Sequence, residues 1–154
     1  MKNHIFLILL SSLSVIPIRL SARPVDILSH EELYKKADLV IIGNVISTQD
    51  EMNYSFVNSK KDSWIPVYTK FKVLSILKGK PDNNVIAFLH YRYYNKKMET
   101  VIINGPCFIK FDPNQSDEFL LYLMKEPAGN VYSPVSGQMD PYISVRKLIS
   151  IFKK

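Results

Sequence analysis

Ala37-Asp38-Leu39-Val40-Ile41-Ile42-Gly43-Asn44-Val45-Ile46-Ser47 is the longest clean apolar stretch of the chain after residue 22. Its apolar side chains occupy both alternating positions of an extended strand, with Leu39, Ile41 and Val45 on one face and Val40, Ile42 and Ile46 on the other. A strand that is apolar on both faces is covered on both sides. Gly43 in its middle indicates a bulge or a sharp bend, which a barrel needs in order to close. We therefore expect residues 38 to 48 to form the first strand of a small β-barrel.

A second run, residues 68–79, has a related pattern. Lys70 and Lys72 alternate with Phe71 and Val73, as in a strand with one face in the core and the other in water. The alternation loosens near residues 74–76, which favours a strongly bent strand over residues 66–77. Further strands are expected over residues 84–91, 101–111 and 118–124, with a short segment at 131–132, between turns rich in Gly, Pro, Asn and Asp.

Helices are expected at both ends of this strand series. Ser29 and Glu32 form a capping-box pattern, which predicts a short helix that ends near Lys36. Asp140 and Pro141 are a cap and a first helical residue, and they precede a pattern with i, i+3, i+4, i+7 spacing. This pattern predicts an amphipathic helix that packs against the barrel or, alternatively, lies on a membrane surface. Its apolar positions are Val145, Leu148, Ile149 and Phe152.

Together these elements predict a mainly β fold, a five-stranded barrel within a single domain over residues 23–154. Residues 37–45, 71–79, 85–88 and 117–123 resemble the netrin-like module, a group that includes the tissue inhibitors of metalloproteinases and small exported bacterial proteins. The resemblance covers about residues 29–124 and implies an OB-type barrel. Its motifs are hydrophobic patterns and a lysine–glycine strand end, so they say more about fold than about function.

The resemblance does not extend to protease inhibition. In the metalloproteinase inhibitors an N-terminal cysteine binds the zinc of the target, and disulfides hold the inhibitory edge. Here no cysteine precedes Cys107, so no inhibitory residue can be carried over. The small bacterial look-alikes imply a binding module whose ligand is unassigned.

The N-terminus has the pattern of a signal peptide over residues 1–22. Lys2 and His4 precede an apolar run of about a dozen residues, Pro17 ends it, and Ala22 offers a small residue for cleavage. A cut after Ser14 is an alternative, and an uncleaved anchor is another, although the run is short for a span of about 20 residues. We expect a periplasmic or secreted protein without a membrane span after processing.

Composition sets further bounds. The 154 residues are 47% hydrophobic, which is typical of a globular chain and not of a disordered or collagenous one. Residues 1–22 hold two basic and no acidic residues, so removing them leaves 18 basic and 14 acidic groups and a net charge of +4. Cys107 is the only cysteine, so an intramolecular disulfide is impossible. We expect Cys107 to be buried in a strand or, alternatively, exposed and able to pair with another chain.

No catalytic motif is recognisable. The histidines His4, His30 and His90 have no metal-ligand spacing, and no nucleophile elbow or phosphate-binding glycine pattern occurs. We therefore predict no enzyme, no cofactor and no metal site. A hydrolase with a non-obvious site would need His30 or His90 near a serine and a carboxylate.

One stretch favours binding. Tyr91, Arg92, Tyr93, Tyr94, Lys96 and Lys97 interleave aromatic and basic side chains, and Trp64 lies in an expected loop over residues 49–65. On an OB-type barrel, such residues bind single-stranded nucleic acid by stacking and charge; alternatively, they pack at the barrel rim. Because export argues against nucleic acid, we predict a module that binds a protein or a cell-envelope component, with oligonucleotide or polyanion binding as the alternative.

Overall fold

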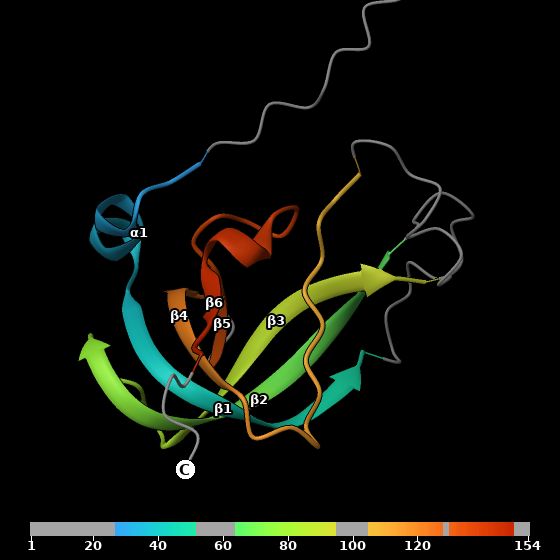
Figure 1. The fold of residues 1–154 in the computed structure, drawn as a ribbon, viewed down its shortest axis with the longest axis horizontal. Coiled ribbons are helices and arrows are strands. Elements are labelled where there is room, and N and C mark those ends of the chain that lie inside the picture. Colours follow the sequence, from blue (N-terminus) through green and yellow to red (C-terminus); the bar gives the residue numbers. More distant parts are fainter. Residues whose placement is uncertain (1–26, 52–63, 95–104, 128–129, 150–154) are drawn as a thin grey trace, which may run out of the picture.

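The computed structural model describes residues 27–51, 64–94, 105–127 and 130–149, and they form a β-barrel with one short α-helix (Figure 1). The expected signal peptide, most of the 49–65 loop, Lys96 and Lys97 lie outside the described residues. No helix within these ranges is long and apolar enough to cross a membrane. The elements, in chain order, are α1 His30–Lys36, β1 Leu39–Asp50, β2 Trp64–Lys78, β3 Val85–Tyr93, β4 Glu118–Lys125, β5 Val131–Pro134, the 3₁₀ turn η3 Pro141–Ile143 and β6 Val145–Lys147.

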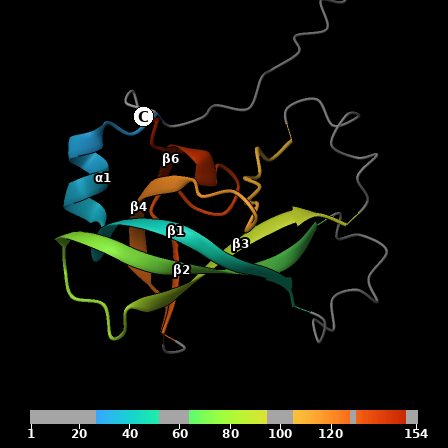
Figure 2. The same cartoon turned by 60° about the horizontal axis from the view of Figure 1, so that its bottom comes forward.

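The strands close on themselves. β1 pairs antiparallel with β2 along one edge and with β4 along the other, β3 pairs with β2, and the short β5 joins β3 to β4. The β3–β5 pairing is parallel and the other pairings are antiparallel. This closed order, β1-β2-β3-β5-β4-β1, confirms the expected five-stranded, OB-like barrel (Figure 2).

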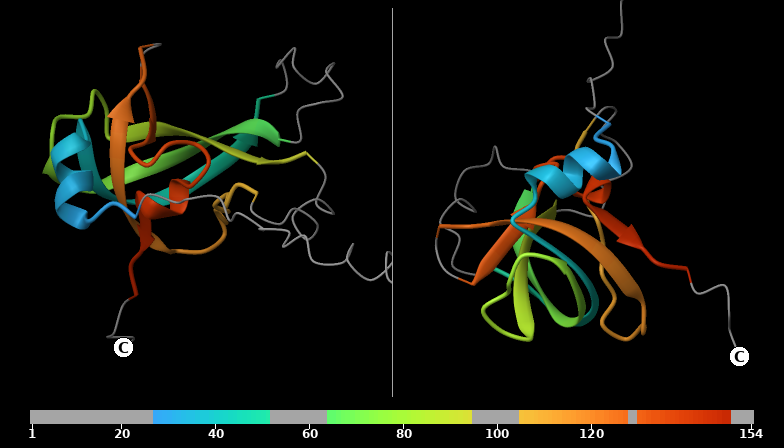
Figure 3. Two further views of the ribbon diagram at one scale, coloured as in Figure 1. Left: turned by 90° about the horizontal axis from the view of Figure 1, so that it is seen from above. Right: turned by 90° about the vertical axis from the view of Figure 1, so that its left-hand side faces the viewer.

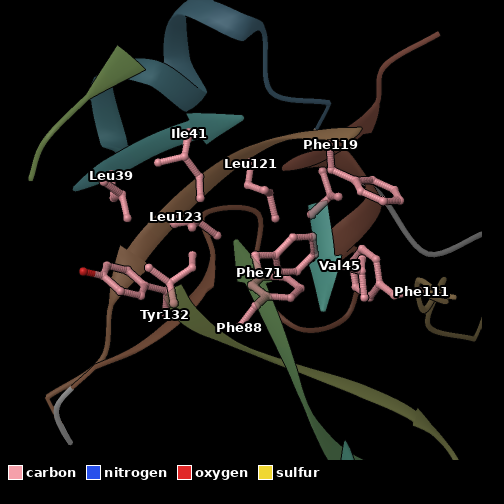
Figure 4. Close-up of a cluster of buried hydrophobic side chains, with 12 residues drawn as sticks. Leu39, Ile41, Val45, Phe71, Phe88, Phe111, Phe119, Leu121, Leu123 and Tyr132 are labelled. Atoms are coloured by element: carbon pink, nitrogen blue, oxygen red, sulfur yellow. The ribbon is translucent and has the colours of Figure 1, made fainter. Parts of the chain in front are cut away.

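Aromatic rings fill the barrel. Phe71 is fully buried and meets the rings of Phe88, Phe111 and Phe119 edge-on, at centroid distances of 5.1 to 6.1 Å. Edge-to-face pairs of this kind stabilise a core beyond the area that they bury. Figure 4 shows these rings beside the aliphatic side chains of β1 and β4. The barrel interior is therefore a packed core.

The capping box predicted for α1 is confirmed. Ser29 Oγ accepts from the backbone N–H of Glu32 at 3.2 Å, and the backbone N–H of Ser29 donates to the Glu32 carboxylate at 2.8 Å. Leu33 is fully buried and packs with Val40, Tyr122 and other residues in a second apolar cluster outside the barrel core. This cluster covers the outer face of β1 at Val40, whereas Ile46 on the same face is 47% exposed, so the predicted burial of both faces holds only at the start of the strand.

The prediction of a strand over residues 101–111 is wrong for the described part of that segment. Residues 105–111 have no regular secondary structure. Pro106 has no N–H for a ladder, and its carbonyl instead accepts from the Tyr93 hydroxyl at 2.9 Å. Phe111 enters the barrel core. The apolar residues of this segment therefore hold it by side-chain contacts, and β5 takes the place beside β3.

The C-terminal helix is also wrong within residues 141–149. Pro141–Ile143 forms only a 3₁₀ turn, and Val145–Lys147 pairs with Phe119–Leu121 as β6 (Figure 3). The edge of β4 beyond β5 offers ladder hydrogen bonds, and Val145 reaches the barrel core from β6. An isolated helix of about ten residues is only marginally stable in water, so pairing with β4 is favoured over the helix.

Candidate binding surface

The sequence-predicted aromatic residues meet at the start of β2. Trp64 pairs with Tyr93 and Ile65 pairs with Arg92 in the β2–β3 ladder. Phe108 contacts both rings, with centroid distances of 4.8 Å to Tyr93 and 6.2 Å to Trp64. Trp64 thus lies in a strand and not in the expected loop.

Most of these side chains are already engaged within the chain. Tyr93 is 7% exposed. Arg92 donates to both carboxylate oxygens of Asp50, at 2.8 and 2.5 Å, and to the Tyr93 carbonyl at 2.9 Å. This bidentate pair holds the pKa of Asp50 below its usual range. Tyr94 is the exception, with 63% of its surface exposed.

His90 lies in the barrel interior and not at the surface. It is 2% exposed, stacks on Phe88, and its Nε2 lies 2.8 Å from the Thr69 hydroxyl, which in turn lies 3.0 Å from that of Thr48. Its Nδ1 has no hydrogen-bond partner among the residues that the structure describes. Burial lowers the pKa of His90 to about 4, so the ring is neutral at pH 7.

Each described histidine is hydrogen-bonded to a hydroxyl group of Thr or Tyr. The hydrogen-bond partner of His90 is Thr69, and that of His30 is Tyr122, at 2.9 Å. Among the described residues, no group of three or more His, Cys, Asp or Glu side chains could hold a metal ion. Cys107 is exposed and lies in no strand, so its expected burial is wrong.

A cavity of about 290 Å³ lies between the 110–119 segment and β6. Lys147 pairs with Asp117 at 2.6 Å across it, and the Asp112 carboxylate accepts from the Asn114 backbone and the Gln115 amide. Both of its carboxylates are thus engaged by the chain's own groups. The cavity therefore presents no unpaired carboxylate to a ligand.

The outer face of β2 and β3 is basic and partly aromatic. Tyr68, Lys70 and Lys72 lie on alternate residues, opposite to the buried Thr69 and Phe71. Both lysines are exposed, and neither forms an ion pair within the described ranges. Strands 2 and 3 are the ligand face of many OB-folds, so this face is a candidate surface for an anionic polymer.

A different surface lies at the other end of the same strand. Residues 74–78, here named the free end of β2, pair with β1 along one edge, whereas the β2–β3 ladder ends at Lys72 and Val85. Leu74, Ile76 and Leu77 are 44%, 50% and 48% exposed. Figures 1 and 2 show this end beside α1, on the far side of the molecule from the start of β2.

The backbone of the free end is nevertheless firmly held. Lys78 Nζ donates to the carbonyls of Tyr34, Lys35 and Ala37 at 2.7, 3.2 and 2.6 Å, which satisfies the C-terminal end of α1. Gly79 has a φ of 78°, and a Cβ there would lie 2.2 Å from the Asp38 carbonyl oxygen. These contacts are a physical reason for the lysine–glycine pattern at the end of β2.

Sequence reasoning missed the free end as a candidate surface. The signal was present, because the alternation of β2 breaks down at Leu74, but it was interpreted as strand bending alone. Bulges are indeed there: the β1–β2 register shifts leave Leu74 and Leu77 without opposite partners. The exposure of their side chains depends on where β3 stops, which the pattern of β2 does not encode.

No family model matches the chain, and no curated protein matches it either. The netrin-like resemblance therefore stays a prediction.

Proposed function

We propose that the protein is an exported binding module that recognises a cell-envelope component or a protein partner through the free end of β2. The observation that carries this proposal is the exposure of Leu74, Ile76 and Leu77 on a backbone fixed by Lys78 and Gly79. Clustered exposed apolar side chains on a soluble domain mark interaction sites. The filled barrel core supports a role for the outer surface over one for the interior.

The proposal also includes export of the protein and its relationship to the netrin-like family. The signal-peptide pattern of residues 1–22 supports export with cleavage near Ala22, and the OB-like strand order supports the netrin-like relationship. The N-terminal residue of the protein isolated from periplasm or medium tests the first part. A mature protein that begins near Arg23 is expected, and an intact Met1 on a cytosolic protein would overturn export.

Site-specific photo-cross-linking in cells that export the protein tests the binding surface. A photoreactive amino acid at Leu77 should give a discrete adduct, whether to lipid or to protein. The same amino acid at Gln115, an exposed residue of the 112–115 turn, is the matched control and should give none. Adducts at 115 but not at 77 would move the site elsewhere.

A polyanion-binding function is the second candidate, because Lys70 and Lys72 follow Tyr68 at alternate positions on an outer face, and the residues of β2 and β3 include no carboxylate. Lys70→Gln with Lys72→Gln should then weaken binding of single-stranded DNA and of dextran sulfate alike, with a smaller salt dependence. Absence of binding at low salt would remove this candidate.

A further inference from the structure

We propose that the free end of β2 docks on the surface of an anionic phospholipid bilayer, an inference that rests on the proposed binding function and names its partner. Two features of this end carry the inference: the aliphatic side chains that it exposes and the lysines that surround them.

The aliphatic side chains are suited to shallow insertion. Leu74, Ile76 and Leu77 are each about half exposed within four residues, and Tyr34 of α1, 45% exposed, donates to the Leu77 carbonyl at 3.1 Å. Apolar side chains with an aromatic ring beside them are what peripheral proteins place in the boundary between headgroups and acyl chains.

The surrounding charge is complementary to anionic headgroups. Lys35, Lys72 and Lys80 are exposed, and none of them forms an ion pair within the described part of the chain. The nearby Asp82 carboxylate is held by Lys125 at 2.8 Å. Each lysine close to an anionic bilayer strengthens attachment by about fivefold.

The same features disfavour a second copy of the chain as the partner that binds the free end of β2. An antiparallel pairing of two free ends would bring Lys72 of one copy close to Lys78 and Lys80 of the other, and like charges across a strand pair are destabilising. The bulges at Leu74 and Leu77 also interrupt the ladder that an added strand would need. A lipid surface needs no such register.

A bilayer can also contact this end without unfolding it. Lys78 ties the strand to the last turn of α1, and Gly79 seats the following turn against Asp38. The aliphatic side chains therefore stay exposed on a rigid backbone, and docking orders few additional residues.

Co-sedimentation of the exported form with vesicles tests the inference. The probes are phosphatidylcholine vesicles with about one third phosphatidylglycerol, and pure phosphatidylcholine vesicles. Binding to the first that falls on addition of salt, with weak binding to the second, is expected. Equal binding to both, or binding to neither, would overturn the inference.

Paired variants locate the contact. Leu74→Ser with Ile76→Ser should abolish sedimentation, and Lys72→Gln with Lys80→Gln should weaken binding by about twenty-five-fold. Tyr142→Ser and Arg146→Gln, exposed residues of η3 and β6, are matched controls and should bind as the unaltered protein does. Thermal unfolding of each variant checks that it folds. Controls that lose binding as strongly as the β2 variants would contradict the site.

The cross-linking result separates the two proposals. If position 77 is cross-linked to a protein and vesicles do not bind, the lipid inference fails while the binding function stands. If position 77 gives no adduct and vesicles do not bind, both fail.

Discussion

The two ends of β2 differ sharply although they belong to one strand. From Val67 to Lys72 the strand has a partner on each edge and its side chains alternate between core and solvent, whereas residues 74–78 have β1 alone and expose aliphatic side chains. The aromatic residues predicted to form a binding site lie at the start of β2, where Tyr93 and Arg92 are engaged by hydrogen bonds within the fold. An exposed apolar surface on a fixed backbone is the stronger indication of binding.

The largest difference in the loss of unfolding free energy is expected between alanine substitutions at Phe71 and at Leu74, three residues apart. Phe71→Ala removes a fully buried ring that meets three others and should cost about 3–5 kcal/mol of unfolding free energy. Leu74→Ala should cost under about 1 kcal/mol because the side chain is already half in water. Urea unfolding measures both. Equal losses would mean that the free end is part of the core.

Acid should act on the barrel through His90. The pKa of His90 is about 4 in the folded protein, whereas its ordinary value, which applies to the unfolded chain, is 6.5. Between these two pH values the unfolded chain binds the proton and the folded chain does not. Stability should therefore be unaffected above pH 6.5 and fall by about 3 kcal/mol towards pH 4.

His90→Leu is the variant that isolates this effect. Its unfolding free energy should be nearly flat between pH 6.5 and about 5, since Asp50 and Glu32, whose pKa values are lowered by Arg92 and Ser29, lose their contributions only at lower pH. A slope in the variant as steep as in the parent protein would assign the acid sensitivity to other groups.

Gly79 and Gly137 form a matched pair that tests how firmly the free end is held. Both have positive φ, 78° and 79°, but a Cβ at 79 would collide with the Asp38 carbonyl, while at 137 it would meet nothing within 4 Å. Gly79→Ala should cost about 2–3 kcal/mol and Gly137→Ala about 1 kcal/mol. Equal costs in thermal unfolding would show that the turn at Gly79 and the backbone of Asp38 are not in close contact.

Lys78 should have the smallest effect on stability. Lys78→Met keeps the aliphatic stem but removes the three hydrogen bonds to α1, which should cost about 1 kcal/mol and expose the amides of α1 to faster hydrogen exchange. Lys80→Met, two residues on, is the control and should change neither. An unchanged α1 in Lys78→Met would remove the proposed anchor.

Much of the fold could be predicted from local patterns. The two-sided apolar run of β1, the alternation of Phe71 with its lysine neighbours and the Ser29 capping box each depend on near neighbours in sequence. The predictions failed where contacts with residues distant in sequence determine the secondary structure. Val145 joins a strand because β4 has an open edge, and Phe111 is buried in the barrel without being in a strand.

The candidate surface was harder to predict for the same reason. Tyr93 and Arg92 have side chains typical of binding sites, yet Pro106 and Asp50, far away in sequence, engage them. The loosened alternation near Leu74 predicted a bend, whereas the exposure of Leu74 and Leu77 depends on the early end of the β2–β3 ladder.

Hydrogen–deuterium exchange of the protein, with and without vesicles containing phosphatidylglycerol, compares the two ends of β2 most directly. Residues 74–80 should become protected on binding, while residues 64–72 and Tyr94 should not change. Protection confined to the start of β2 and to Tyr94 would contradict this prediction and return the binding site to the aromatic end of the strand.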